Sequence, residues 1–187
     1  QLRKSEKYLL DVDHYIQFIK QEKPDTTIII NPNNPNGGYI EKQDLYKILD
    51  ELKFVENIVL DESFIHFAYE TASHEMINYS DLISTYKNLI LIKSMSNDFG
   101  IAGIRAGYGV MDEKKVPSLL KNGYLWNISG LAYYFFKTYQ NIDFRNKYES
   151  VRKKYIIETD KFFNELHNID GIRVYPSKAN FALIEIV

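Results

Sequence analysis

The chain has 187 residues, of which 45% are hydrophobic and 26% charged, and this suits one domain, or one domain and a piece of another. It has no cysteine, which excludes disulfides, thiolate metal sites and cysteine nucleophiles. The formal net charge is −2 with both signs well mixed, so nothing points to a nucleic-acid partner. The sequence contains neither an apolar run that could cross a bilayer nor an N-terminal secretory signal, and its first residue is not methionine. We therefore expect a soluble, cytoplasmic protein without a membrane partner, whose sequence continues upstream of residue 1.

The N-terminal part alternates between helical and strand patterns. The spacing of apolar residues predicts a helix over 12–23, which Pro24 ends. Residues 26–30 are a continuous β-branched run, typical of a strand that is buried on both faces. The turn-rich segment 31–38 follows, and a further apolar stripe predicts a helix over 41–53.

The middle of the chain continues this alternation, which is typical of an α/β fold. The apolar runs 57–60 and 88–92 are predicted to be buried strands, and each ends at polar residues. Residues 105–110 are expected to form a fourth strand.

The C-terminal part is expected to turn helical after Pro117. Large apolar residues recur there at steps of three or four, with one longer step: Phe144, Tyr148, Val151, Tyr155, Phe162 and Leu166. The pattern predicts a long amphipathic helix with one buried stripe that packs into the core rather than lining a ligand site. Gly171 is expected to stop this helix, and residues 172–175 and 181–187 to form strands.

Polar side chains follow three of the predicted strands at their carboxyl ends. They are Asn33 and Asn34, Asp61 and Glu62, and the segment 94–97. In open parallel sheets, ligands bind in the crevice beyond the carboxyl ends of the strands. Any one of these clusters alone is better explained by a helix cap or a turn, but three at equivalent positions favour a ligand site.

The residue types in these clusters suit a phosphorylated pyridine ring. Ser94, Ser96 and Arg105 offer two hydroxyls and a cation for a phosphate ester. Asp61 closes an apolar strand, and a partly buried carboxylate needs a positive partner such as the pyridinium nitrogen of pyridoxal phosphate (PLP). Asn34 lies in a loop braced by two prolines and could donate to the ring's phenolic oxygen. The alternative for Arg105 is a surface salt bridge, which its position between glycines disfavours.

Four segments in this order resemble class I/II aminotransferases of PLP fold type I, most of all the branch of histidinol-phosphate aminotransferases and threonine-phosphate decarboxylases. They are Asn-Pro-Asn-Asn-Pro-Asn-Gly at 31–37, Asp-Glu-Ser-Phe at 61–64, the serine- and glycine-rich run 94–107, and 175–181. The resemblance covers essentially the whole chain. It implies a three-layer α/β fold with a mostly parallel sheet. Residues 1–142 would be part of the PLP-binding large domain, and residues 143–187 a linking helix and the first strands of a small α+β domain.

The resemblance also implies PLP as the cofactor and a role for each matching residue. Asn34 would bind the phenolic oxygen, Asp61 the ring nitrogen, and Ser94 and Arg105 the phosphate, with Ser96 as a weaker candidate. Phe64 stands where many relatives have a tyrosine, so a ring contact replaces a hydrogen bond there.

Asn97 occupies the position of the lysine that family members use to form a Schiff base with the cofactor and then to shuttle a proton. A carboxamide does neither, and acid–base catalysis alone is typically worth about 10²–10⁴ in rate. Lys93 is the nearest alternative amine, but it is expected on the strand end. Asn97 is either an engineered or accidental change or the mark of a pseudoenzyme.

The function expected from this resemblance is transfer of an amino group between an amino acid and a 2-oxo acid, by a protein that is a homodimer at full length. Two alternatives stay open: a PLP-dependent decarboxylase of the threonine-phosphate type, and a non-catalytic binding module. A different α/β phosphate-binding enzyme is disfavoured, because the sequence has neither a P-loop nor a dinucleotide-binding fingerprint. The histidines show no metal-ligand spacing and are expected at surface or helical positions: His14, His66, His74 and His167.

Overall fold

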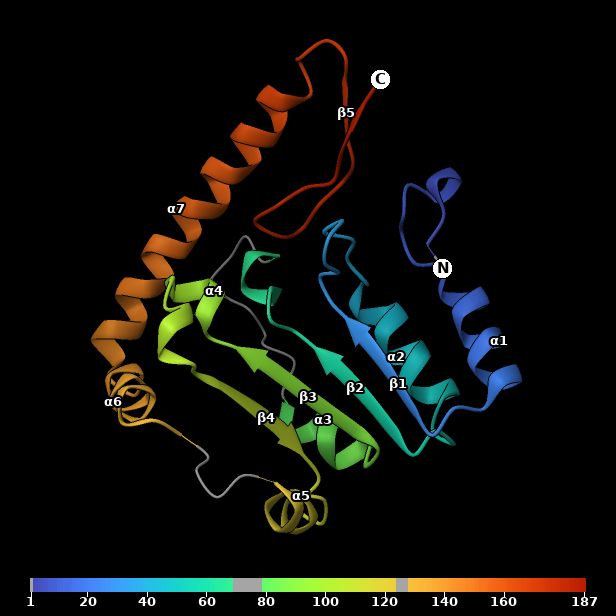
Figure 1. Cartoon of the computed structure of the whole chain (residues 1–187), viewed down its shortest axis with the longest axis vertical. Coiled ribbons are helices and arrows are strands. Elements are labelled where there is room, and N and C mark those ends of the chain that lie inside the picture. Colours follow the sequence, from blue (N-terminus) through green and yellow to red (C-terminus); the bar gives the residue numbers. More distant parts are fainter. Residues whose placement is uncertain (1, 69–78, 124–127) are drawn as a thin grey trace.

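The computed structural model describes residues 2–68, 79–123 and 128–187 (Figure 1). Its main sheet has the strand order β1-β2-β3-β4, where the strands are Thr26–Ile30, Asn57–Asp61, Leu89–Ser94 and Gly107–Met111. β1, β2 and β3 run parallel, and β4 pairs antiparallel with β3. The predicted α/β fold with a mostly parallel sheet is therefore confirmed, and the four predicted strands are present with small shifts at their ends.

Three helices pack against one face of this sheet: α1 (Val12–Glu22), α2 (Lys42–Glu51) and α3 (Tyr79–Thr85). Leu60 of β2 and Leu91 of β3 point into this layer and are fully buried. The two N-terminal helices match the predicted ranges, because their apolar residues recur at helical spacing and can face the sheet together.

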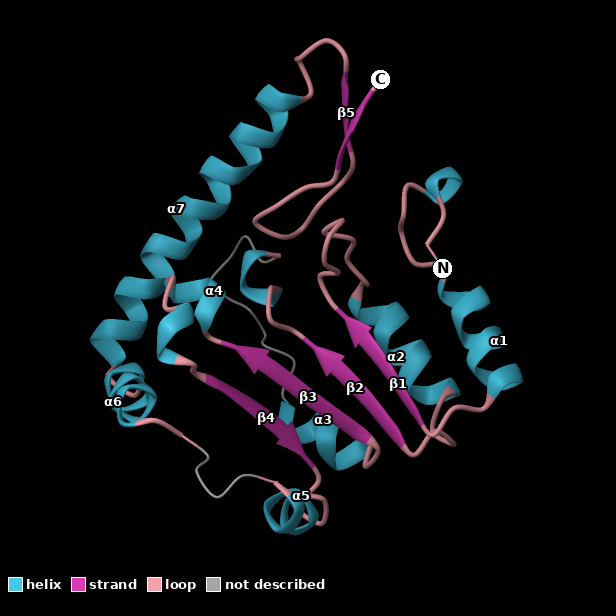
Figure 2. Ribbon diagram, viewed as in Figure 1, coloured by secondary structure: helices cyan, strands magenta, loops and turns pink. Residues whose placement is uncertain are grey.

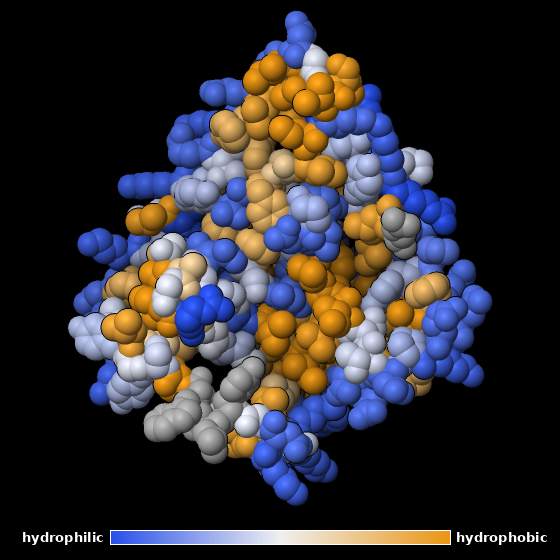
Figure 3. Space-filling view, in the orientation of Figure 1, coloured by the Kyte–Doolittle hydropathy of each residue, from blue (hydrophilic) through white to orange (hydrophobic). Residues whose placement is uncertain are grey.

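The described residues cover the other face of the sheet only in part, so the expectation that β1 is buried on both faces is wrong. Ile28 is 64% exposed and Ile92 is 37% exposed, although both lie in strands whose neighbouring residues are buried. In Figure 3, which looks onto this face, apolar residues gather over the middle of the sheet. A β-branched run indicates that a strand is apolar on both faces. It does not determine whether another segment covers each face.

The remaining elements lie along the edges of this core. They are the 3₁₀ turns η1 (Lys4–Glu6), η2 (Ile65–Phe67) and η3 (Ala102–Ile104), the helices α4 (Ser96–Phe99), α5 (Val116–Asn122), α6 (Gly130–Tyr139) and α7 (Ile142–Leu166), and the strands β5 (Ile172–Val174) and β6 (Ile184–Ile186). Within the described ranges, none of the helices is both long and apolar enough to span a bilayer.

The stripe predicted on α7 is only partly buried, which corrects the expectation of a core-packed helix. Val151, Tyr155 and Phe162 are 60%, 45% and 55% exposed, whereas Arg152 and Ile156 of the same helix are buried. The N-terminal half of α7 packs beside α4, and its C-terminal half extends past the sheet (Figure 2). The periodicity thus predicted the helix correctly, but it did not predict how much of the helix packs against the rest of the protein.

β5 and β6 form an antiparallel pair that is separate from the main sheet. The turn between them lies against the loop after β1, where the Lys178 N–H donates to the Gly37 carbonyl at 2.8 Å. Gly37 has φ +71°, and a Cβ there would lie 1.8 Å from Ser177 Oγ, so this contact requires glycine. The division of the chain into domains at residues 142 and 143 stays a prediction.

Candidate active site

The three polar clusters that follow β1, β2 and β3 lie at one edge of the sheet. The strands are neighbours and run parallel, with Ile30 beside Asp61 and Asp61 beside Ile92 in register. The segments 31–38, 61–64 and 94–97 therefore leave the sheet side by side, as the sequence predicted.

A pocket of about 290 Å³ lies beside the end of β3, and we call it the serine pocket. Its polar lining consists of Ser63, Lys93, Ser94, Ser96, Arg105 and Tyr108. Three of the predicted site residues therefore meet in one hollow. The Ser96 backbone N–H donates to Ser94 Oγ at 3.2 Å, which ties the Ser94 hydroxyl to the backbone of Ser96.

Arg105 is exposed and sits at the end of η3 in a left-handed conformation, with φ 59°. Its Nη1 donates to the Ala102 carbonyl at 3.1 Å. In the part of the chain that the structure describes, its guanidinium pairs with no carboxylate, so the surface salt bridge considered above is not formed.

Ser63 joins the carboxylate of Asp61 to the serine pocket, and the sequence analysis missed this residue. The Ser63 hydroxyl donates to Asp61 Oδ1 at 2.5 Å and accepts the Ser94 N–H at 3.2 Å. A hydroxyl directly after the Asp-Glu pair was the signal that could have identified it.

Asn34 and Phe64 do not line the serine pocket. Asn34 is exposed at the tip of its loop. The Phe64 ring meets Phe181 edge to face, with centroids 4.9 Å apart.

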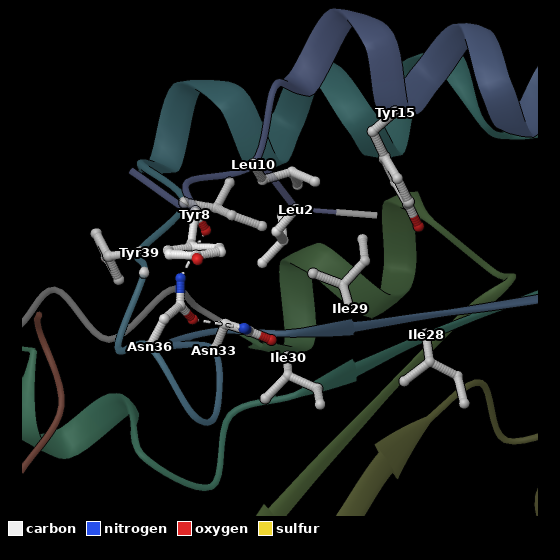
Figure 4. A pocket seen from close by; sticks show the side chains of 12 residues that line it. Leu2, Tyr8, Leu10, Tyr15, Ile28, Ile29, Ile30, Asn33, Asn36 and Tyr39 are labelled. Atoms are coloured by element: carbon white, nitrogen blue, oxygen red, sulfur yellow. Dashed lines mark hydrogen bonds between the residues drawn. The ribbon is translucent and has the colours of Figure 1, made fainter. Parts of the chain in front are cut away.

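The loop that carries Asn34 is fixed by its other asparagines, at a second hollow beside β1 (Figure 4). Asn33 Nδ2 donates to Asn36 Oδ1, and Asn36 Nδ2 donates to the Tyr8 carbonyl, both at 2.6 Å. The asparagine at position 36 therefore ties the loop to the N-terminal segment.

Asn97 lies in α4, is exposed, and lines a different cavity from the serine pocket. This cavity of about 160 Å³, which we call the α7 cavity, is bordered by α4, by Phe67 at the end of η2, by α7 and by Asn180.

Lys93 does not offer a free amine in place of residue 97. It is 2% exposed, and its Nζ donates to the carbonyls of Ser63 and Ser94 at 3.1 and 3.0 Å and to Asp98 Oδ2 at 2.5 Å. Burial lowers the pKa of Lys93, and the Asp98 carboxylate opposes that shift. The three donor positions of the ammonium are thus occupied, and the lysine anchors the turn that carries Asn97.

His66 continues this buried network, so of the two predicted positions, surface or helix, it takes the helical one, in the short 3₁₀ turn η2. Its Nδ1 lies 3.0 Å from Asp98 Oδ2 and 3.1 Å from the Tyr148 hydroxyl, and burial raises the pKa of Tyr148. The sequence analysis missed Asp98 and Tyr148, because their partners are distant in sequence. His14 and His167 are exposed as expected, and His74 lies outside the described residues. Among the described residues, no cluster of histidines and carboxylates could hold a metal ion.

The sequence profile of the aminotransferase class I and II family matches residues 1–187. The chain belongs to this family. Members of the aminotransferase class I and II family are PLP-dependent enzymes, which confirms the resemblance described above.

Three relatives and one solved structure place the chain within this family. It is 54% identical over 187 residues to an L-serine phosphate decarboxylase of Campylobacter jejuni, covering 100% of this chain and 48% of the relative. It is 45% identical to an L-serine phosphate decarboxylase of Sulfurospirillum multivorans (99% and 47%) and 35% identical to a histidinol-phosphate aminotransferase of Thermoanaerobacter (98% and 49%). The structure of a decarboxylase from Sulfurospirillum multivorans superposes with a TM-score of 0.91 at 45% identity, over 99% of this chain and 47% of that one.

These comparisons correct the expected function. Transamination was the main expectation, but the chain is more similar to the decarboxylases than to the histidinol-phosphate aminotransferases. The motifs in the sequence are shared by both activities, so they could not separate them. The chain spans about half the length of the curated relatives it matches.

Proposed function

We propose that this chain is the core of a PLP-dependent decarboxylase that acts on a phosphorylated amino acid of the L-serine phosphate kind. The observation that carries this proposal is the 54% identity, over all 187 residues, to a relative named for that reaction. The match to a decarboxylase structure with a TM-score of 0.91 supports it.

The donor set of the serine pocket fits the phosphate group of PLP. The hydroxyls of Ser94 and Ser96 and the guanidinium of Arg105 line one hollow, and a cation with hydroxyls is a suitable set for a phosphate ester. Asp61 would hold the ring nitrogen, and Ser63 orients its carboxylate. Asn34 would donate to the phenolic oxygen, and Phe64 would contact the ring.

When bound, PLP supplies an electron sink for the bond that breaks at the α-carbon. Decarboxylation of L-serine phosphate breaks the bond to the carboxylate, releases CO₂ and places a proton on that carbon, which gives ethanolamine phosphate. On this chain, Ser94, Ser96 and Arg105 would hold the phosphate group of PLP. Asp61 would keep the ring nitrogen of PLP protonated. The carboxamide of Asn97 cannot deliver the proton.

A second candidate function follows from Asn97 itself. A chain that binds PLP but lacks the lysine would be a non-catalytic binding module. The two candidates differ in what a lysine at position 97 restores.

The test replaces the matching segment of the Campylobacter jejuni relative with residues 1–187 and follows ethanolamine phosphate formed from L-serine phosphate. The Asn97→Lys chimera should be at least about 10²–10⁴-fold faster than the Asn97 chimera, and Asn97→Gln, the matched control, should stay slow. An Asn97→Lys chimera that folds and binds PLP but releases no CO₂ would contradict the decarboxylase proposal. Size-exclusion chromatography with light scattering on the same chimeras tests the predicted homodimer.

A further inference from the structure

The α7 cavity lies apart from the serine pocket, and of its lining residues only Asn97 enters the proposed function. Its volume is about 160 Å³, whereas a water molecule takes up roughly 30 Å³ of the liquid. Besides Asn97, its walls include Phe67, Asp98, Tyr148 and Asn180. The space is sufficient for a small organic molecule.

Among the residues that the structure describes, two buried oxygen atoms on the lining of this cavity have no hydrogen-bond partner. They are Oδ1 of Asp98, whose side chain is 0% exposed, and Oδ1 of Asn180. A buried acceptor without a partner costs about 1–3 kcal/mol. Both atoms are acceptors only, so the group that would satisfy them must be a hydrogen-bond donor.

The Asp98 carboxylate lines the cavity and favours a donor with a positive charge, because charge-assisted hydrogen bonds are the stronger ones. Lys93 is committed to Oδ2 of Asp98, the other oxygen of that carboxylate. Arg152 also lines the cavity, but its guanidinium is bound to the Glu149 carboxylate and the His66 carbonyl.

The cavity walls are also suited to a cation. The rings of Phe67, Tyr148 and Tyr155 line the space. Aromatic faces attract cations, by about 0.5–1 kcal/mol at exposed sites and more where water is excluded. A primary ammonium carries three donors and a charge, so it can bond to both oxygens and still lie against a ring.

We propose that the α7 cavity is a binding site for a primary ammonium group, which donates to Asp98 Oδ1 and Asn180 Oδ1. The group can come from a free alkylammonium ion or, in the chain without cofactor, from a lysine side chain at position 97, since Asn97 borders the same space. The site needs neither cofactor nor substrate, so its test is independent of the proposed activity.

The first arm uses the 187-residue chain and n-butylammonium chloride, followed by calorimetric titration and by the melting temperature. Butylammonium should bind saturably and raise the melting temperature with concentration, and 1-butanol, which has the same carbon chain without the charge, should not. Asn180→Ala, at a residue that is only half-buried, should weaken the binding roughly tenfold, the effect of about 1.4 kcal/mol. Equal effects of butanol and butylammonium, or no effect of either, would overturn the proposal.

The second arm supplies the ammonium from the chain itself. Asn97→Lys should melt at a higher temperature than Asn97→Met, which has a side chain of similar length without a donor, and it should no longer bind butylammonium. In the Asn180→Ala background, the difference between lysine and methionine should shrink. Equal melting temperatures of the lysine and methionine variants would contradict a site for an ammonium on residue 97. Asp98→Asn changes the other residue of the proposed site. If the Asp98→Asn variant does not fold, the Asn180 variants still test the site.

Discussion

The turn from Ser94 to Asp98 separates two unlike surroundings. On the side of the serine pocket, the groups are hydroxyls and an exposed guanidinium that pairs with no carboxylate among the described residues. On the side of the α7 cavity, Asp98 is fully buried and held by Lys93 and His66. One short segment thus carries both a surface that suits an anion, on the side of the serine pocket, and a buried ion-pair network, on the side of the α7 cavity. The buried network holds the segment in place. Mutations on the two sides should therefore affect different measurements.

The largest effect is expected on the buried side. Asp98→Ala leaves the Lys93 ammonium buried without its carboxylate, and breaking a buried ion pair in this way costs about 3–5 kcal/mol. The free energy of unfolding, measured with urea, should fall by that amount.

The matched control for this change is an exposed ion pair. Lys161 and Glu158 lie 2.7 Å apart, but their side chains are 61% and 68% exposed. Glu158→Ala should change the free energy of unfolding by less than about 1 kcal/mol. Similar losses in the two variants would show that the buried network does not hold the turn.

Arg105→Ala tests the open side. Hydrogen bonds to charged groups contribute about 1.5–3 kcal/mol, so PLP should bind roughly 10- to 100-fold more weakly, while the urea midpoint stays nearly unchanged. Equilibrium dialysis measures the affinity. Arg173→Ala, which removes an exposed arginine paired with Glu185, is the control and should leave PLP binding unaltered. Wild-type affinity in the Arg105 variant would remove Arg105 from the site.

Gly107→Ala tests the backbone between the serine pocket and the α7 cavity, because Gly107 pairs with Ser94 at the end of β3. A Cβ at Gly107 would lie 2.9 Å from the Lys93 carbonyl oxygen, whereas at Gly109 the nearest atom is the end of the Met111 side chain at 3.4 Å. Overpacking of this kind costs about 1–3 kcal/mol, so Gly107→Ala should unfold at lower urea concentration than Gly109→Ala. The reverse order would contradict the close approach of β4 to β3 at this point.

The smallest effect concerns alkaline pH. Burial raises the pKa of Tyr108, a residue of the serine pocket, from 10.0 to about 12. Because the folded-state pKa is the higher one, the contribution of this phenol to stability is fully present below pH 10 and is lost as the pH rises toward 12. The urea midpoint of the wild type should therefore fall more steeply over that range than that of Tyr108→Phe. Tyr134→Phe, at an exposed position, is the control and should follow the wild type.

The parts of the fold that local pattern determines could be predicted from the sequence. The β-branched run of β1 and the apolar spacing of α1 gave both elements within a residue or two of their observed ends. Because polar clusters followed parallel strands, the edge of the sheet that carries the site could also be predicted. The meeting of Ser94, Ser96 and Arg105 in one pocket agrees with that prediction, while their role toward PLP stays a proposal.

The rest depends on partners that are distant in sequence. The exposure of Ile28 depends on what covers the sheet, and the exposure of Val151 on how far α7 extends beyond the core. The contact of His66 with Asp98 joins residues of η2 and α4, and sequence periodicity does not predict such a pair. The choice between decarboxylase and aminotransferase was equally hidden, because the shared motifs describe the cofactor and not the bond that breaks.

The backbone bond between Lys178 and Gly37 connects the β5-β6 pair to the loop that carries Asn34. The ion pair of Lys4 with Glu185 and the contact of the Tyr8 ring with Tyr175 join the same pair of strands to the N-terminal segment. A displacement of the β5-β6 pair would therefore reach both the N-terminal segment and the loop of the residue proposed to bind the phenolic oxygen of the cofactor.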